Sequence, residues 1–162
     1  MITITLPDGS TRSFDGPVTG NQIAKSISEG LWRECVAVEI DGTATDLSVP
    51  IAADAAVRLI TTRDPEGLHI MRHSAAHVMA EAVQKVFPGA ALTIGPVVED
   101  GFYYDIDMDP VSEDIFPRVE AEIKKIVSAK TPFTRKEVAK TDALEFYRDQ
   151  PYKTEIINEI DD

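Results

Sequence analysis

The alternation of apolar and polar residues at the start of the chain predicts a β-hairpin followed by a helix. Residues 2–6 read Ile-Thr-Ile-Thr-Leu, the two-residue period of a half-buried strand, and a Pro-Asp-Gly-Ser turn joins them to a second strand at residues 11–14. Thr19 and Gln22 have the spacing of a capping box, so we expect a helix to begin after Thr19 and to end at Gly30.

Three further apolar runs predict the remaining strands of the same sheet. Residues 35–40 and 43–47 flank Asp41-Gly42, the strongest short hairpin signal in the sequence, and residues 56–60 read as a last buried strand. The order strand, strand, helix, strand, strand, strand is that of a small sheet clasping one helix. We therefore expect a β-grasp domain at residues 1–62.

A long helical pattern follows a polar segment that contains both Pro and Gly. We place a domain boundary in this segment, so that a second domain covers residues 63–162. The helix is expected from Leu68 to Val86, with an apolar face formed by residues three and four positions apart. These apolar positions are Leu68, Met71, Ala75, Val78, Met79, Ala82, Val83 and Val86.

Strand and helix signals alternate in the rest of the chain. Residues 92–98 and 102–108 are expected as strands around a Glu-Asp-Gly turn, and Gly95 should mark a bulge or a close approach by another backbone or a ligand. Residues 112–130 read as a helix and residues 132–138 as a strand.

One short helix and one further segment are expected at the end of the chain. Thr141 is expected to cap a short helix, and Pro151-Tyr152-Lys153 opens the last segment. The pattern as a whole predicts an α+β protein in which antiparallel strands accompany a long helix.

All three histidines of the chain lie in the long helical segment, at His69, His73 and His77. Each step of four residues turns the helix by about 40°, so the three imidazoles share one side and can converge on one ion, water or substrate group. No Glu follows His73, so the metalloprotease pattern is not met. A role as ordinary helix-surface histidines remains open.

Composition favours a soluble protein with enough apolar residues to form hydrophobic cores. The 162 residues are 43% hydrophobic, and no window approaches the roughly 18 apolar residues of a membrane span. We expect no membrane association and a cytoplasmic location. The single cysteine, Cys35, cannot form an internal disulfide and is expected to be buried in a strand.

The net charge of −12 argues against non-specific binding to nucleic acid, which needs an excess of lysine and arginine. The charge is unevenly distributed, however, and residues 118–140 hold seven basic residues against three acidic ones, so a locally positive strip remains open. The basic residues are Arg118, Lys124, Lys125, Lys130, Arg135, Lys136 and Lys140.

Several motifs, taken in order, carry a resemblance to a known family. The opening MITITLPDGSTRSFDGPVTGNQIAKSIS resembles a TGS domain. The stretches HSAAHVMAEAV, TIGPVVEDGFYYDID and PYKTEII resemble the amino-terminal editing domain of the threonyl-tRNA synthetase family. The resemblance runs over essentially the whole chain and implies a β-grasp TGS domain followed by an incomplete α+β editing domain.

The resemblance also implies a set of site residues. In the family, the two histidines of HSxxH line a pocket that hydrolyses mischarged seryl-tRNA, and the lysine of the PYK motif belongs to the same pocket. Gly95 and Tyr104 lie on strands that the family uses around the terminal adenosine, although a role of Tyr104 as a packed strand aromatic remains open. The implied catalytic residues are His73, His77 and Lys153, without a metal, and His69 lies outside the motif.

In the family, the chain continues beyond these motifs to a Cys-x-x-x-His pair, to a catalytic domain that binds ATP, threonine and zinc, and to an anticodon-binding domain. We therefore expect an amino-terminal fragment that needs no cofactor itself and is inactive alone. The implied partners are the acceptor end of tRNA(Thr), with threonine or serine as its aminoacyl group. The parent is expected to form a homodimer through the absent domains.

Two alternatives stay open. The first is a metal-dependent trans-editing hydrolase of the alanyl type, in which His73 and His77 help to hold zinc. The second is a TGS binding or regulatory module with no chemistry of its own.

Overall fold

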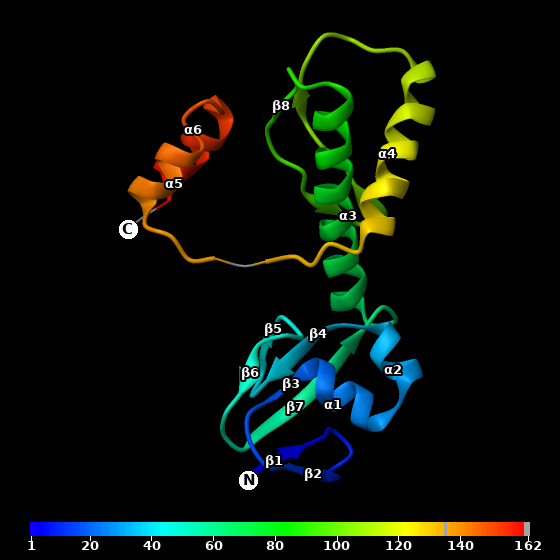
Figure 1. The fold of residues 1–162 in the computed structure, drawn as a ribbon, viewed down its shortest axis with the longest axis vertical. Coiled ribbons are helices and arrows are strands. Elements are labelled where there is room, and N and C mark those ends of the chain that lie inside the picture. Colours follow the sequence, from blue (N-terminus) through cyan, green and yellow to red (C-terminus); the bar gives the residue numbers. More distant parts are fainter. Residues whose placement is uncertain (135, 161–162) are drawn as a thin grey trace. The chain divides into compact units, whose positions relative to one another are not determined.

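The computed structural model describes residues 1–134 and 136–160, and the chain divides into two compact units, Met1–Met71 and Arg72–Asp162 (Figure 1). The domain limits expected at residues 62 and 63 stay a prediction. None of the helices in the described part of the chain is long and apolar enough to cross a lipid bilayer.

The first unit contains a five-stranded sheet with the order β2-β1-β7-β4-β5. The inner pair β1 and β7 is parallel and the other neighbours are antiparallel, which is the β-grasp arrangement that the sequence predicts. The strands are β1 (Ile2–Thr5), β2 (Thr11–Phe14), β4 (Cys35–Ile40), β5 (Thr43–Thr45) and β7 (Ala55–Thr61).

Helix α1 (Gly20–Ile27) begins at the predicted capping box. The Thr19 hydroxyl accepts a hydrogen bond from the Gln22 backbone N–H at 3.3 Å, and the Gln22 side-chain oxygen accepts one from the Thr19 N–H at 2.9 Å. Two donors that the helix leaves unpaired at its start are thereby satisfied.

The predicted helix end at Gly30 is wrong. Helix α1 ends at Ser28, whose N–H donates to the Ala24 carbonyl, and the Ser28 hydroxyl accepts from the Leu31 N–H at 3.1 Å and so begins helix α2 (Glu29–Glu34). One serine therefore closes one helix and caps the next. Two very short paired strands that sequence analysis did not predict complete this unit, β3 (Val18–Thr19) and β6 (Pro50–Ile51).

The hairpin predicted at Asp41-Gly42 is confirmed. Both residues adopt positive φ angles, 48° and 85°, the combination that a two-residue hairpin turn requires. The Asp41 carboxylate also accepts a hydrogen bond from the Ala56 N–H at 2.9 Å, which ties the turn to β7. Cys35 is buried as expected. The core of this unit is aliphatic: Ile2, Ile4, Val18, Ile23, Val38, Ile51 and Val57.

Helix α3 (Pro65–Val86) confirms the long helix predicted around the histidines. The predicted apolar face is confirmed only in its later half, where Ala82 and Val83 are buried. In its first half, Leu68, Met71 and Ala75 are exposed. The helix buries small residues, which allow neighbouring segments to approach closely enough to cover them. These buried residues are Ala76, Ala80, Ala82 and Val83.

The hairpin after α3 is present but its strands are shorter than predicted. Strands β9 and β10 pair next to the turn, and β8 and β11 pair at the open end. Between them, the Thr93 N–H donates to the Asp105 carbonyl at 3.1 Å, so the two segments stay side by side across the Gly95 interruption. The strands are β8 (Ala91–Leu92), β9 (Val97–Val98), β10 (Gly101–Phe102) and β11 (Ile106–Asp107).

The predicted helix at residues 112–130 appears as a 3₁₀ turn, η1 (Glu113–Ile115), and helix α4 (Phe116–Ala129), with a proline in its first turn where no donor is needed. Val119 of α4 packs with Ala82, Val83 and Ala90, which form the buried cluster of the second unit. The cluster is small, and most of the apolar side chains around it are only partly buried.

Two predictions in the last segment are wrong. No strand forms at residues 132–134 or 136–138, because no partner backbone pairs with this segment among the described residues; Arg135 lies outside them. Thr141 does not cap a helix, since helix α5 (Lys140–Phe146) begins after Ala139 and Thr141 lies within it. Helix α6 (Pro151–Glu159) begins at the predicted proline.

Candidate active site at a histidine pair

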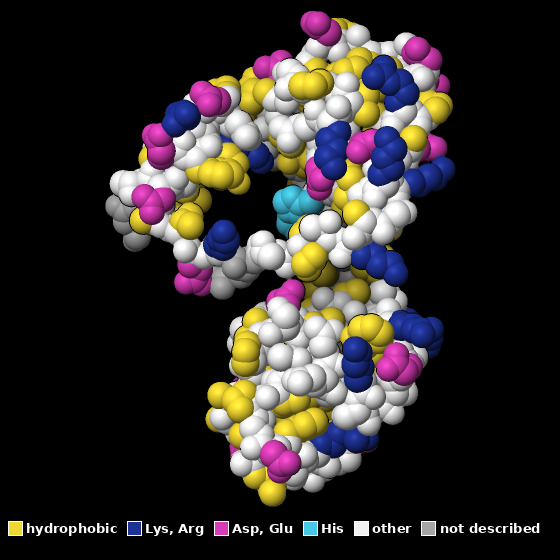
Figure 2. Space-filling model, in the orientation of Figure 1, with side chains coloured by type: hydrophobic (Ala, Val, Ile, Leu, Met, Phe, Trp, Pro, Cys, Tyr) yellow, Lys and Arg dark blue, Asp and Glu magenta, His cyan; other side chains and the backbone are white. Residues whose placement is uncertain are grey.

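His73 and His77 face each other on one side of α3. Their Nε2 atoms are 3.1 Å apart, and the two rings meet edge to face at an angle of 86°, with centroids 4.7 Å apart. A hydrogen bond at this distance requires one Nε2 to donate its proton and the other to accept with its lone pair, and the tautomers of the two rings decide which is which. The space-filling view shows histidine side chains, in cyan, at the molecular surface (Figure 2).

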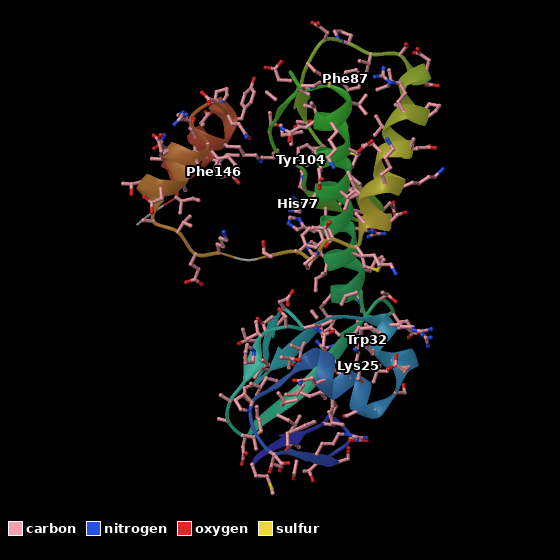
Figure 3. All side chains as sticks on the ribbon, in the orientation of Figure 1. Lys25, Trp32, His77, Phe87, Tyr104 and Phe146 are labelled. Atoms are coloured by element: carbon pink, nitrogen blue, oxygen red, sulfur yellow. The ribbon has the colours of Figure 1, made fainter. Side chains whose placement is uncertain are left out.

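A pocket of about 420 Å³ lies against the histidine pair. It brings together all five residues that the sequence singles out, from α3, the hairpin and α6; their roles stay a prediction. Figure 3 labels two of them, His77 on α3 and Tyr104 on the hairpin. The lining residues are His73, Ala76, His77, Thr93, Ile94, Gly95, Pro96, Tyr104, Lys153 and Ile156.

Gly95 and Tyr104 form one wall of the pocket. A Cβ atom on Gly95 would lie 2.2 Å from the Tyr104 ring carbon Cδ2, so only glycine lets the ring lie against this stretch of backbone. The close approach expected at Gly95 is therefore made, within the chain, by an aromatic side chain; a ligand contact at Gly95 stays a prediction. Burial raises the pKa of the Tyr104 hydroxyl, which keeps it protonated at neutral pH.

Lys153 reaches the pocket from α6. Its ammonium donates a hydrogen bond to the Thr93 carbonyl at 3.0 Å, and its side chain is half-buried. An ammonium has three donors, so this contact leaves others for a ligand. The lysine thus places a fixed positive charge beside two imidazoles.

The pocket favours the neutral form of His77. Burial is the largest cause that lowers the pKa of His77, and the charges of His73 and Lys153 lower it further. A neutral imidazole has one nitrogen that can accept a proton, which is what a general base or a water-orienting group needs.

The structure adds lining residues that sequence reasoning missed. Ala76 lies three residues after His73 on the same helical side, so helical spacing would have identified it. Thr93 and Ile156 had no such signal, because the fold alone brings the hairpin and α6 to α3. His69 is not among the described lining residues.

The described residues contain no group of three or more His, Cys, Asp or Glu side chains placed to hold a metal ion. The histidine pair therefore offers two ligands, whereas protein zinc sites use three or four.

The basic strip predicted at residues 118–140 is partly neutralised. Lys125 pairs with Glu122 at 2.9 Å, and Glu122 also lies 3.9 Å from Lys85 of α3, which pairs with Glu81 at 2.8 Å. Such exposed pairs contribute little stability but reduce the local positive charge. Whether the basic strip at residues 118–140 contacts nucleic acid is not tested by the structure.

Comparisons with known proteins match both parts of the chain. Residues 2–61 match the TGS domain family. The whole chain is 85% identical to part of a threonine–tRNA ligase from Desulfosudis oleivorans and covers 25% of that protein. It is also 63% identical to a threonine–tRNA ligase from Desulfatibacillum aliphaticivorans and 62% identical to one from Desulforapulum autotrophicum, covering 26% of each.

The chain thus spans about a quarter of the length of the curated relatives it matches. The TGS match ends at residue 61, within β7, the last strand of the β-grasp sheet. Residues 2–61, which form the β-grasp sheet, match the TGS domain family, and the chain as a whole matches the amino-terminal region of threonine–tRNA ligases.

Proposed function

We propose that the histidine pocket is an editing site that removes serine from mischarged tRNA(Thr) within a threonine–tRNA ligase. The observation that carries the proposal is the convergence of His73 and His77 with Lys153 in one pocket of 420 Å³. In this proposal the parent enzyme attaches threonine to tRNA(Thr) with ATP, and the present region corrects its errors.

The physical need for such a site follows from the substrates. Threonine and serine differ by one methyl group, and one missing methylene in a pocket is worth only about 1–3 kcal/mol, or roughly 10- to 200-fold in selectivity. A separate hydrolytic pocket that admits serine and excludes the extra methyl multiplies this selectivity. Gly95 and Tyr104, which form a fixed wall, are the residues we assign to binding of the aminoacyl-adenosine end.

The histidine pair would activate water. A water molecule that replaces the contact between the two Nε2 atoms can donate a hydrogen bond to neutral His77, which takes its proton as the oxygen attacks the ester carbonyl. The bond between the carbonyl carbon and the ribose oxygen then breaks, and the ribose oxygen takes up the proton from His77, which returns to its neutral form. Serine and tRNA with a free terminal hydroxyl are released.

Lys153 would stabilise the negative charge that develops on the carbonyl oxygen. Its ammonium is already held at the pocket by the Thr93 carbonyl, so it needs little rearrangement when the transition state forms. The same positive charge favours the neutral form of His77, which is the form that accepts a proton.

The experiment compares wild-type full-length synthetase with the double variant His73→Ala, His77→Ala. We expect deacylation of pre-formed seryl-tRNA to fall by about 10²- to 10⁴-fold, the usual cost of an oriented acid–base group. Threonine activation should be nearly unchanged, because we place that reaction in a domain outside this chain. Unchanged deacylation in the double variant would refute the editing function.

The remaining assignments concern the parent enzyme. We assign the acceptor end of tRNA(Thr), carrying threonine or serine, as the partner of the pocket, and we place ATP, zinc and the homodimer contacts in domains outside this chain. The chain alone is expected not to hydrolyse seryl-tRNA, because the family adds a Cys-x-x-x-His pair that faces the histidines. Deacylation by the 162-residue chain at the full-length rate would contradict this expectation.

A further inference from the structure

Helix α6 carries Lys153 but has no buried residue of its own. Its side chains at the hairpin are half-buried at most, and Ile156, which lines the pocket, is 36% exposed. Apolar burial therefore contributes little to the position of α6. Specific polar contacts must hold the helix where Lys153 can reach the histidines.

Two adjacent residues of α6 make such contacts. The Tyr152 hydroxyl donates a hydrogen bond to Asp107 Oδ2 at 2.8 Å, and the Lys153 ammonium donates to the Thr93 carbonyl at 3.0 Å. Asp107 pairs with Ala91 in the hairpin ladder. The helix is thus attached to both strands of the hairpin at neighbouring points.

The spacing of the two attachment points explains why they act together. Asp107 lies opposite Ala91, and Thr93 follows two residues later, directly after β8, a separation of about 7 Å along an extended chain. A single contact by the long lysine side chain would leave α6 free to pivot about it. The second contact, from the shorter and stiffer tyrosine, removes that freedom.

We propose that Tyr152 is a positioning residue, whose hydrogen bond to Asp107 holds α6 so that the ammonium of Lys153 stays in the histidine pocket. The kinetic consequence rests on the proposed editing function, whereas the placement of Lys153 does not.

The electrostatics of the contact support the role. The bond to Asp107 raises the pKa of the Tyr152 hydroxyl, so the hydroxyl remains a donor throughout the neutral range. A bond from a hydroxyl to a carboxylate is charge-assisted and stronger than a neutral one. The hydrogen bond affects the histidine pair through Lys153, because the positive charge of Lys153 lowers the pKa of His77.

The first test measures the His77 pKa by NMR in the 162-residue chain. Lys153→Gln removes the positive charge and should raise the His77 pKa. Tyr152→Phe removes only the hydroxyl and should raise it in the same direction. Tyr147→Phe makes the same chemical change on another tyrosine, which packs edge to face on Phe146, and should leave it unchanged.

A His77 pKa that stays at the wild-type value in Tyr152→Phe, while Lys153→Gln raises it, would overturn the proposal. This readout does not depend on catalysis. Unchanged amide shifts in the β-grasp domain and α3 would confirm that the variant keeps its fold.

The second test is a double-mutant cycle on seryl-tRNA deacylation by the full-length synthetase. Loss of one hydrogen bond of this kind should lower kcat by about 3- to 10-fold in the presence of Lys153. In the Lys153→Gln background, Tyr152→Phe should change kcat less than 2-fold, because a residue that acts only through Lys153 has nothing left to position. Equal losses in both backgrounds would contradict the positioning role.

Asp107→Asn provides an independent variant that weakens the acceptor and keeps the tyrosine. It should reproduce the kcat loss of Tyr152→Phe, and unchanged kcat would count against the proposal. If the histidine variants leave deacylation intact, the editing function fails, but the His77 titration still decides whether Tyr152 places Lys153.

Discussion

The two units of the chain are built on different principles. The first encloses fully buried aliphatic side chains, including Ile4, Ile23 and Ile60 at 0% exposure. The second buries mainly alanine and valine, and it leaves Phe133 70% and Phe146 78% exposed. The first unit therefore has a tightly enclosed aliphatic core, whereas the second has a smaller core of small side chains surrounded by partly buried apolar residues, with the candidate pocket at its surface.

This difference indicates which unit can hold a polar pocket. A pocket with a charged lysine and two imidazoles would be costly inside a well-packed aliphatic core, because buried polar groups need partners. The second unit keeps these groups at a half-exposed surface, where α3, the hairpin and α6 meet.

The largest expected effect concerns the two cores. Ile23→Ala should lower the free energy of unfolding of the first unit by about 2–5 kcal/mol, because it leaves a cavity at a fully buried site. Val119→Ala, which removes less volume at a less enclosed site, should cost the second unit about 1 kcal/mol. Denaturation followed by Trp32 fluorescence reports the first unit, since Trp32 is the only tryptophan, and amide NMR signals report the second.

Equal losses at the two positions would break the comparison between the cores. A coincident transition for both probes would also contradict it, because the units would then unfold together.

The next effect tests the wall of the pocket. Gly95→Ala should displace the Tyr104 ring and lower the free energy of unfolding of the second unit by about 1–3 kcal/mol, the usual cost of overpacking. Gly101→Ala is the matched control, because no atom lies within 4 Å of its added Cβ. Chemical denaturation and the Tyr104 ring signals measure both variants. A Gly95→Ala variant as stable as Gly101→Ala would show that the ring is not fixed by the glycine.

A smaller effect is expected in the pH dependence. The lowered pKa of His77 keeps it neutral at neutral pH. As the pH falls, kcat/KM for deacylation should therefore stay constant until the pH is below about 6.5, where the acid limb begins. Lys153→Gln should move that limb to higher pH. The free energy of unfolding should change in the same direction as kcat/KM. His77 binds a proton more readily in the unfolded chain, so stability is lost as the pH falls from about 6.5 through the lowered pKa of folded His77. An acid limb that begins above pH 6.5 in the wild type would contradict a neutral His77.

The smallest effect is expected on metal removal. The editing reaction proposed here uses two imidazoles and a lysine, so a chelator should leave deacylation by the full-length synthetase unchanged. Elemental analysis of the purified chain should find less than one zinc per molecule. One zinc per chain that survives mild chelation would favour the alanyl-type hydrolase instead.

Local signals carried most of what the sequence predicted. The Thr19 capping box, the Asp41-Gly42 turn and the long helix with its histidines each depend on residues a few positions apart, and the structure confirms all three. The helix end at Gly30 was missed because Ser28 caps the following short helix, and a six-residue helix has too few turns to show a period. A strand at residues 132–138 needs a partner that the local pattern cannot supply.

Only part of the candidate site could be predicted from local signals. Helical spacing alone puts His73 and His77 on one side of α3, and the family motifs add Lys153, Gly95 and Tyr104. The contact between Tyr152 and Asp107 joins residues 45 positions apart; both lie in family motifs, but no local pattern pairs them. Long-range polar contacts of this kind become visible only when the fold is known.

The most direct test of the account compares three single variants of one helix. His73→Ala and His77→Ala should each lower seryl-tRNA deacylation by the full-length synthetase by about 10²-fold or more. His69→Ala should stay within a few-fold of wild type, because His69 is not among the described pocket residues. Rapid-quench deacylation of pre-formed seryl-tRNA measures all three. Equal losses at positions 69, 73 and 77 would show that the substitutions disturb the helix and that the pocket does not carry the chemistry.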